Sequence, residues 1–296
     1  MSLPRLVAAL LTVLLAGCGS VTAAPGTAMS SRPVPRETYA VGMRTLTVDP
    51  GSARPLRVTV WYPTAGGTVA PGRFPMVLHS HGLRSLPALH AALTTRWAAA
   101  GFVVAAPTYP HTNLRAQRFD RHDVRNQPAD AWRVVRHLTR LAGTRGDPFA
   151  GHLDTARIAA SGHSAGGFTT AGMFTSGHPD RLRAGIVIAG GGMAGSFAGP
   201  PAALLFVHGG ADQVVPLTVG RAAYDRTDWP RAFLTLSGQG HGEYLTPGRP
   251  GFEQILAATT DLLRWRLYDD AAAGRRIAAG ATRAGVTSFE NRLGTP

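Results

Sequence analysis

The chain has 296 residues, of which 44% are hydrophobic and 16% charged, and a formal net charge of +13. This composition excludes a disordered protein and is typical of one well-packed domain, because α/β folds of this length are commonly a single unit. All 30 basic residues are arginines scattered along the chain, and the absence of any basic run argues against a nucleic-acid site.

Residues 1–17 have the features of an export signal. Arg5 precedes a short apolar run, residues 6–15, and the only cysteine of the chain, Cys18, follows it. The run is too short to span a membrane, and small residues before a lone cysteine resemble a bacterial lipoprotein signal, which is cleaved so that the thiol is lipidated. We therefore expect export and a membrane anchor at Cys18; an ordinary secretory signal cut near residues 23–25 is the alternative.

Residues 18–38 are rich in Ser, Thr, Ala, Pro and Gly and are typical of a flexible tether, which leaves residues 39–296 as the folded domain. The domain begins with two runs of alternating polar and apolar residues, 45–48 and 56–62. This alternation predicts half-exposed antiparallel strands at the edge of a sheet.

Strand and helix patterns then alternate. We expect strands at 74–80, 102–106, 158–161, 184–189, 203–208 and 232–236, the last of the sheet, and helices at 86–100, 128–141 and 252–268. The tail, residues 274–296, is expected to form a short helix or to fray. The alternation predicts an α/β fold with a mostly parallel sheet, helices on both faces, and ligands at the carboxyl ends of the strands.

The pentapeptide from Gly162 to Gly166 fits the pattern Gly-x-Ser-x-Gly, with a strand before it and a helix after it. This context predicts that Ser164 is a nucleophile in a sharp strand-to-helix turn, with the amide of Ala165 directed toward the developing oxyanion. The simpler interpretation is a plain glycine–serine turn, since the chain has 36 glycines.

Two residues that follow later strands complete a candidate triad. Asp212 comes directly after an apolar strand, and His241 lies in a glycine-rich segment after the next one. A serine hydroxyl needs an imidazole to remove its proton and a carboxylate to orient that imidazole. His208 is a less favoured base because it lies at the end of a buried strand, and Glu243 is a less favoured acid because it is too close to His241 along the chain.

The loop after residues 74–80 is expected to supply the second oxyanion donor. Gly82 would let the backbone approach the nucleophile, so that the amide of Leu83 acts together with that of Ala165. His79 and His81 share one face of the strand, but no Cys, Asp or Glu lies nearby in sequence to complete a zinc site. We therefore expect neither a metal nor a cofactor.

These motifs give residues 74–268 a resemblance to the α/β-hydrolase superfamily, and within it to predicted dienelactone hydrolases, platelet-activating-factor acetylhydrolase-like esterases and bacterial polyester hydrolases. The landmarks are Phe74-Pro75 through His81-Gly82-Leu83, the segment 121–141, Leu153-Asp154-Thr155-Ala156-Arg157-Ile158, Gly162 to Gly167, Asp212 and His241. The resemblance implies an α/β-hydrolase fold, a serine nucleophile, no cofactor and a small-molecule ester substrate.

The chain also departs from these relatives. True dienelactone hydrolases have a cysteine nucleophile, where this chain has Ser164. Polyester hydrolases typically carry an aromatic residue at the position of Leu83, and a tryptophan where this chain has the glycine-rich segment 190–197. The resemblance therefore gives no support for an aromatic clamp or for efficient polyester cleavage.

The connection from 189 to 203 is too short for a large lid, which favours short-acyl or otherwise accessible esters, with Met193 and Phe197 as candidate acyl-pocket residues. The sequence thus predicts an exported serine carboxylesterase. Acyl transfer to an acceptor other than water, hydrolysis of polyesters or lipids, and a non-catalytic surface lipoprotein remain open, as does the oligomeric state.

Overall fold

The computed structural model describes Met1, residues 34–35 and residues 38–295. Contacts divide the chain into Met1–Ser31 and Arg32–Pro296, and the second unit is the one considered below. Residues before 39 also pack against this unit, because Val34 contacts its apolar core. Cys18 and the export signal after Met1 lie outside the described residues.

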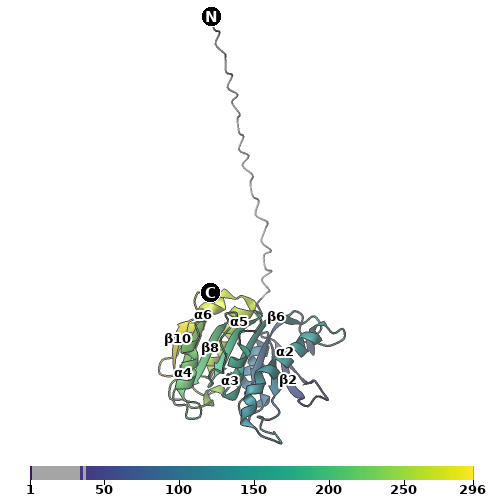
Figure 1. Ribbon diagram of the computed structural model, residues 1–296, viewed down its shortest axis with the longest axis horizontal. Helices are drawn as coiled ribbons and strands as arrows, with labels where there is room; N and C mark the ends of the chain where they lie inside the picture. The colour runs from purple at the N-terminus through teal and green to yellow at the C-terminus, as the bar shows by residue number, and fades with distance from the viewer. Residues whose placement is uncertain (2–33, 36–37, 296) are drawn as a thin grey trace. The chain divides into compact units, whose positions relative to one another are not determined.

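One mixed sheet forms the centre of this unit (Figure 1). Its strands run in the order β1-β2-β5-β4-β6-β7-β8-β9-β10, and β3 pairs with β2. Neighbours from β5 to β9 are parallel, while β1, β2 and β10 join antiparallel. The strands are β1 (Ala40–Val48), β2 (Leu56–Ala65), β3 (Thr68–Val69), β4 (Phe74–Ser80), β5 (Val103–Thr108), β6 (Leu153–His163), β7 (Leu182–Ile188), β8 (Ala203–Gly209), β9 (Arg231–Leu236) and β10 (Thr287–Arg292).

Helices cover both faces of the sheet and enclose two apolar cores. One core includes side chains from α2 (Gln127–Gly143), α3 (Ala165–Met173) and α4 (Leu217–Arg226). The other includes side chains from α1 (Ala91–Ala99), α5 (Phe252–Tyr268) and α6 (Ala271–Ala281). Short 3-10 helices are η1 (Pro87–His90), η2 (Arg121–Asn126) and η3 (Glu243–Leu245). The predicted α/β-hydrolase architecture is confirmed.

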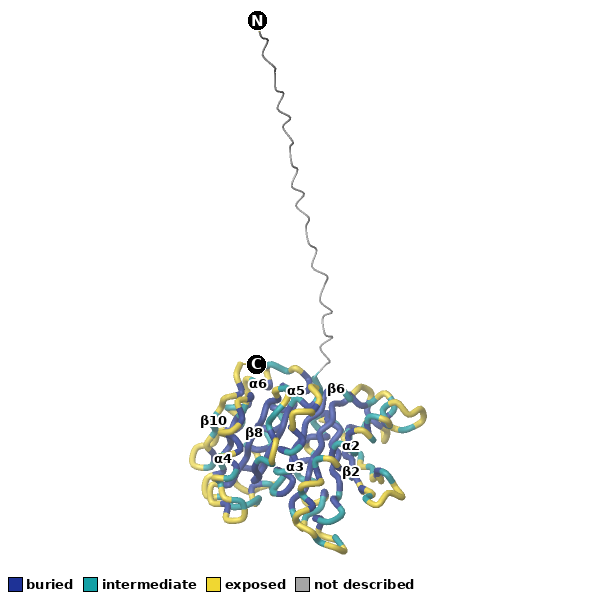
Figure 2. The backbone as a smooth tube through the Cα atoms, in the orientation of Figure 1, coloured by how far each residue is buried: buried dark blue, intermediate teal, exposed yellow. Residues whose placement is uncertain are grey.

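Burial follows the sequence pattern of each element. Strands β4 and β8 are buried along their whole length, as expected for continuous apolar strands covered on both faces, whereas β1 alternates between exposed and less exposed positions. Figure 2 shows the buried strands at the centre of the unit with exposed segments around them. Helix α2 buries Ala131, Val134, Val135 and Leu138, a three- and four-residue spacing that turns one face to the sheet.

The prediction that 232–236 is the last strand is wrong. The tail forms α6 and then β10, which pairs with β9 from Thr287↔Leu236 to Arg292↔Arg231. Its sequence, Thr-Ser-Phe-Glu-Asn-Arg, is half exposed and carries two charges, which suits an edge strand. The run is too polar to be recognised from an apolar pattern.

Candidate active site

Ser164 occupies the sharp turn between β6 and α3, with φ 57° and ψ −122°. This left-handed region is strained for a residue with a side chain. A Cβ on Gly162 would collide with the carbonyl of Gly166, and a Cβ on Gly166 with that of Ser80. The Ser164 amide donates to the carbonyl of Ile188 at 2.9 Å. The two glycines therefore allow a tight, fixed turn that presents the serine at the carboxyl ends of the strands.

The structure brings Ser164, His241 and Asp212 into one hydrogen-bonded row. The Ser164 hydroxyl lies 2.8 Å from Nε2 of His241, and Nδ1 of the same ring lies 2.8 Å from Oδ2 of Asp212. With the imidazole proton on Nδ1, the ring donates to the carboxylate and its Nε2 can accept the serine proton. This is the geometry of a serine nucleophile with its general base.

Asp212 is held at one carboxylate oxygen by its own loop after β8 and at the other by His241. Its Oδ1 accepts hydrogen bonds from the amides of Val214 at 2.8 Å and Val215 at 2.9 Å. Burial alone would raise the pKa of Asp212, but the hydrogen bonds from His241 and these two amides outweigh it and hold the pKa below its ordinary value. The carboxylate is therefore ionised when it orients His241.

The two rival residues have other contacts. His208 is buried, and its Nε2 donates to the carbonyl of Val215 at 2.8 Å while lying 3.5 Å from Oδ2 of Asp212. The Glu243 carboxylate accepts a hydrogen bond from the amide of Gly242 at 3.1 Å. Neither is hydrogen-bonded to Ser164 in the described part of the chain, so the geometry favours His241 and Asp212 over both.

The loop after β4 approaches the nucleophile closely, as the oxyanion prediction requires. A Cβ on Gly82 would lie 3.1 Å from the Ser164 Cβ, so a side chain there would crowd the serine. His81 fixes this loop: its Nδ1 donates to the Gly82 carbonyl at 2.7 Å, and its Nε2 accepts from the Tyr109 amide at 3.1 Å. The Ala165 amide is the first of α3 and has no helical carbonyl to bind.

A row of histidines extends behind His241, in which His79 and His90 are buried and His163 is partly buried. The rings of His241 and His163 have centroids 4.9 Å apart, His163 and His90 are 5.6 Å apart, and His90 and His79 are 4.8 Å apart. Nε2 of His163 donates to the backbone carbonyl of His241 at 2.5 Å. Burial lowers the pKa of His163 to about 4 and that of His79 to about 3. These rings are therefore neutral near pH 7, and His163 anchors the loop that carries His241.

A model of the PET hydrolase-like family matches residues 20–246. The chain belongs to this family. A search of curated proteins found no significant match. The family comprises serine ester hydrolases with the α/β-hydrolase fold, so the resemblance given by the motifs is confirmed, and this chain is an enzyme that hydrolyses carboxylic ester bonds.

Beside Ser164, this PET hydrolase-like chain has a cavity of about 360 Å³. Leu83 and Ala165 line it, as the oxyanion prediction implies. Arg121 is its charged member, and the other lining residues are apolar: Val124, Phe168, Val214, Val215, Pro216 and Val219. Val214, Val215 and Pro216 lie two to four residues after Asp212, so their place beside the site could have been inferred from that of Asp212.

Met193 and Phe197 do not line this cavity. Phe197 packs edge-on against Phe206 and Trp229, and the amide of Met193 donates to the Ser196 hydroxyl at 3.1 Å. The acyl-pocket assignment made for these two residues is therefore corrected, because the glycine-rich loop turns Phe197 into the core instead of toward Ser164.

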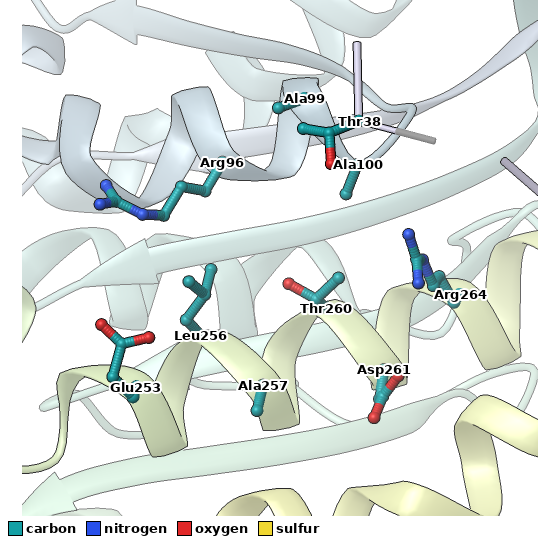
Figure 3. A pocket seen from close by; sticks show the side chains of 10 residues that line it. All are labelled: Thr38, Arg96, Ala99, Ala100, Glu253, Leu256, Ala257, Thr260, Asp261 and Arg264. Atoms are coloured by element: carbon teal, nitrogen blue, oxygen red, sulfur yellow. The ribbon is translucent and has the colours of Figure 1, made fainter. Parts of the chain in front are cut away.

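A second hollow of this PET hydrolase-like chain lies between α1 and α5 (Figure 3). Arg96 extends from α1, while Glu253, Leu256 and Thr260 belong to α5. No residue of the Ser164–His241–Asp212 row lines it. Within the described residues, no group of three or more metal-ligating side chains occurs and no helix is long and apolar enough to cross a membrane.

Proposed function

We propose that the protein is an exported serine carboxylesterase for short-acyl or otherwise accessible esters. The observation that carries this proposal is the unbroken row of two 2.8 Å contacts from Ser164 through His241 to Asp212. His241 removes the proton of Ser164 as the hydroxyl attacks the ester carbonyl, and then protonates the leaving alcohol. Water repeats the sequence on the acyl-enzyme and releases the acid.

The amides of Leu83 and Ala165 hold the negative charge that develops on the carbonyl oxygen. Both residues line the cavity next to Ser164, and donors that are fixed before the reaction cost no reorganisation during it. Asp212 stays ionised and stabilises the imidazolium of His241, because its pKa is held low by the hydrogen bonds it accepts. No cofactor takes part in these steps.

The size and lining of the cavity favour a short acyl or alcohol group. A volume of about 360 Å³ is near the lower end of the range for small-molecule sites. Phe168 is the one aromatic side chain among the lining residues, and Leu83 stands where polyester hydrolases typically carry an aromatic residue. We therefore propose small esters as substrates in preference to a polyester surface, although the family name refers to such a polymer.

The test combines labelling of the nucleophile with a substrate series. A fluorophosphonate should add once to the wild-type protein by intact-mass spectrometry and not at all to Ser164→Ala. The kcat/KM for 4-nitrophenyl esters should be highest between acetyl and hexanoyl, because a methylene contributes roughly 0.8 kcal/mol only when it is buried, and a cavity of about 360 Å³ leaves little room to bury a longer chain. Labelling that persists in Ser164→Ala would remove Ser164 from its role, and a continued rise to palmitoyl would contradict the short-acyl proposal.

We further propose that export ends in lipidation of Cys18, which lies outside the described residues. The support is the sequence pattern alone: an apolar run, small residues and the one cysteine of the chain. In a bacterial host, full-length protein should partition with membranes and begin at a lipid-modified Cys18, whereas Cys18→Ser should not. A mature wild-type protein that begins downstream of Cys18 would indicate ordinary secretion.

A further inference from the structure

The cavity beside Ser164 has one charged residue, Arg121, in an otherwise uncharged lining. Arg121 begins η2 and is exposed to solvent. Within residues 38–295, no hydrogen bond, ion pair or aromatic ring holds its guanidinium. Its guanidinium is permanently charged and has no partner in this part of the protein. It is therefore available to pair with a substrate bound in the apolar cavity.

The carboxylates next to Arg121 in sequence are already engaged. Oδ1 of Asp120 accepts the amide of His122 at 2.9 Å and so begins η2. Both oxygens of Asp123 accept hydrogen bonds from the guanidinium of Arg54, at 2.9 and 2.6 Å. The segment therefore presents positive charge, to which Arg115, Arg118 and Arg125 add.

We propose that Arg121 makes this esterase selective for esters that carry a carboxylate on the group seated in the cavity, such as monoesters of dicarboxylic acids. Apolar walls would accept the chain of such a substrate but would penalise its free carboxylate, because an unpaired charge loses hydration there. A guanidinium can pair with a carboxylate through two parallel hydrogen bonds. Arg121 thus turns the penalty into a preference.

This inference rests on the proposed function, so the experiment compares matched substrates within each variant. The acyl pair is 4-nitrophenyl hydrogen adipate and 4-nitrophenyl hexanoate, which share six carbons and the leaving group and differ in the terminal carboxylate. The alcohol pair is 4-acetoxybenzoate and methyl 4-acetoxybenzoate. For each pair the measured quantity is the ratio of kcat/KM for the anionic ester to that for the neutral one, after subtraction of uncatalysed hydrolysis.

In at least one pair, Arg121→Gln should lower this ratio by about fivefold, the effect of a single exposed charge pair, and the wild-type ratio should fall as salt is added. Arg118→Gln is the matched control: it removes the same charge from the same segment, but Arg118 does not line the cavity, so its ratio should fall much less than that of Arg121→Gln, and an equal fall in the two variants would overturn the inference. Equal ratios for wild type and Arg121→Gln in both pairs would overturn the inference. Absence of Ser164-dependent hydrolysis of the neutral esters would instead overturn the proposed function.

Discussion

The catalytic role proposed for Asp212 depends on one hydrogen bond. Its Oδ2 accepts from Nδ1 of His241, while its Oδ1 is held by two backbone amides. Asp212→Asn keeps the size of the side chain but allows its amide group to donate to Nδ1, which places the imidazole proton on the wrong nitrogen. We expect kcat to fall by on the order of 10⁴.

The measurement is steady-state kinetics on 4-nitrophenyl butyrate, with thermal unfolding as the control that the variant is folded. Asp212 lies in a loop that also contacts His208, so an unchanged unfolding midpoint is needed before the loss is assigned to catalysis. Near-normal turnover in a folded Asp212→Asn would transfer the acid role to another carboxylate.

His163 is a positioning residue, because it contacts the base and not the reacting atoms. Its Nε2 donates to the backbone carbonyl of His241. His163→Phe preserves a planar ring but removes this donor, so the loop that carries His241 loses an anchor. We expect kcat to fall about fivefold, which corresponds to about 1 kcal/mol for one neutral hydrogen bond, while KM changes little.

The matched variant is His163→Gln, whose amide can still donate and should restore part of kcat. Thermal unfolding of both variants distinguishes lost positioning from lost packing. If His163→Phe turned over as fast as the wild type, the contact with the His241 carbonyl would have no role in catalysis.

At the scale of single residues, the sequence predicts the reactive side chains better than the residues that line the cavity. That Ser164, Asp212 and His241 lie together could be predicted because each follows a recognisable strand or motif, and the parallel sheet brings such positions to one edge. Met193 and Phe197 were assigned from loop position alone. Phe197 has φ 62° and packs on Phe206, and no local sequence pattern specifies that turn. The His163 contact likewise depends on the fold of a loop far along the chain.

Some secondary-structure elements could likewise be predicted from the sequence and others could not. The central strands and the long helices were predicted because their apolar periodicity is strong, and α5 has the predicted bounds, Phe252–Tyr268. The strand β10 was not predicted because it is polar and becomes a strand only by pairing with β9. Tertiary context, and not propensity, creates this strand.

Strand β10 closes the edge of the sheet beyond β9 and is expected to be required for stability. Glu290 accepts hydrogen bonds from Arg221 at 2.7 Å and from the Tyr224 hydroxyl at 2.9 Å, and Leu293 is buried. Deleting residues 286–296 removes these contacts and exposes β9 as a pairing edge. We expect a loss of stability on the order of a few kcal/mol and a tendency to aggregate.

Thermal unfolding with light scattering measures both effects. The control truncation removes residues 294–296, which keeps β10 and Leu293, and it should unfold like the full chain. If deletion of 286–296 left the midpoint and the scattering unchanged, the contacts of Glu290 and Leu293 would be dispensable.

The first residues of the folded unit and the Ser164–His241–Asp212 row lie at opposite ends of the parallel strands. The amide of Tyr39 donates to the carbonyl of Ala99 at 2.9 Å, and a Cβ on Gly101 would collide with the ring of Pro35. Ala99 and Gly101 precede β5, so Pro35 and Tyr39 lie at the amino ends of the parallel strands. Ser164 lies at the carboxyl ends.

Four buried or partly buried histidines give the folded unit a predicted sensitivity to acid. Burial lowers the pKa of His79 to about 3 and those of His81 and His163 to about 4, and it also holds the pKa of His90 well below its ordinary value. In the unfolded chain each titrates near about 6.5. Between these values the unfolded state binds more protons, so stability is complete above about pH 6.5 and falls as the pH drops toward about 4.

The expected slope is about 1.4 kcal/mol per pH unit for each proton taken up on unfolding, so the four rings together should cost on the order of 8 kcal/mol by about pH 5. The measurement is the free energy of unfolding by urea at constant ionic strength between about pH 8 and pH 5, a window above the ordinary titration of carboxylates. His79→Gln should reduce the slope because it removes a fully buried ring whose pKa is held at about 3, whereas the exposed His122→Gln should not. A stability that stays constant from pH 7 to pH 5 would mean that these histidines become protonated in the folded protein, and that their burial does not keep them neutral.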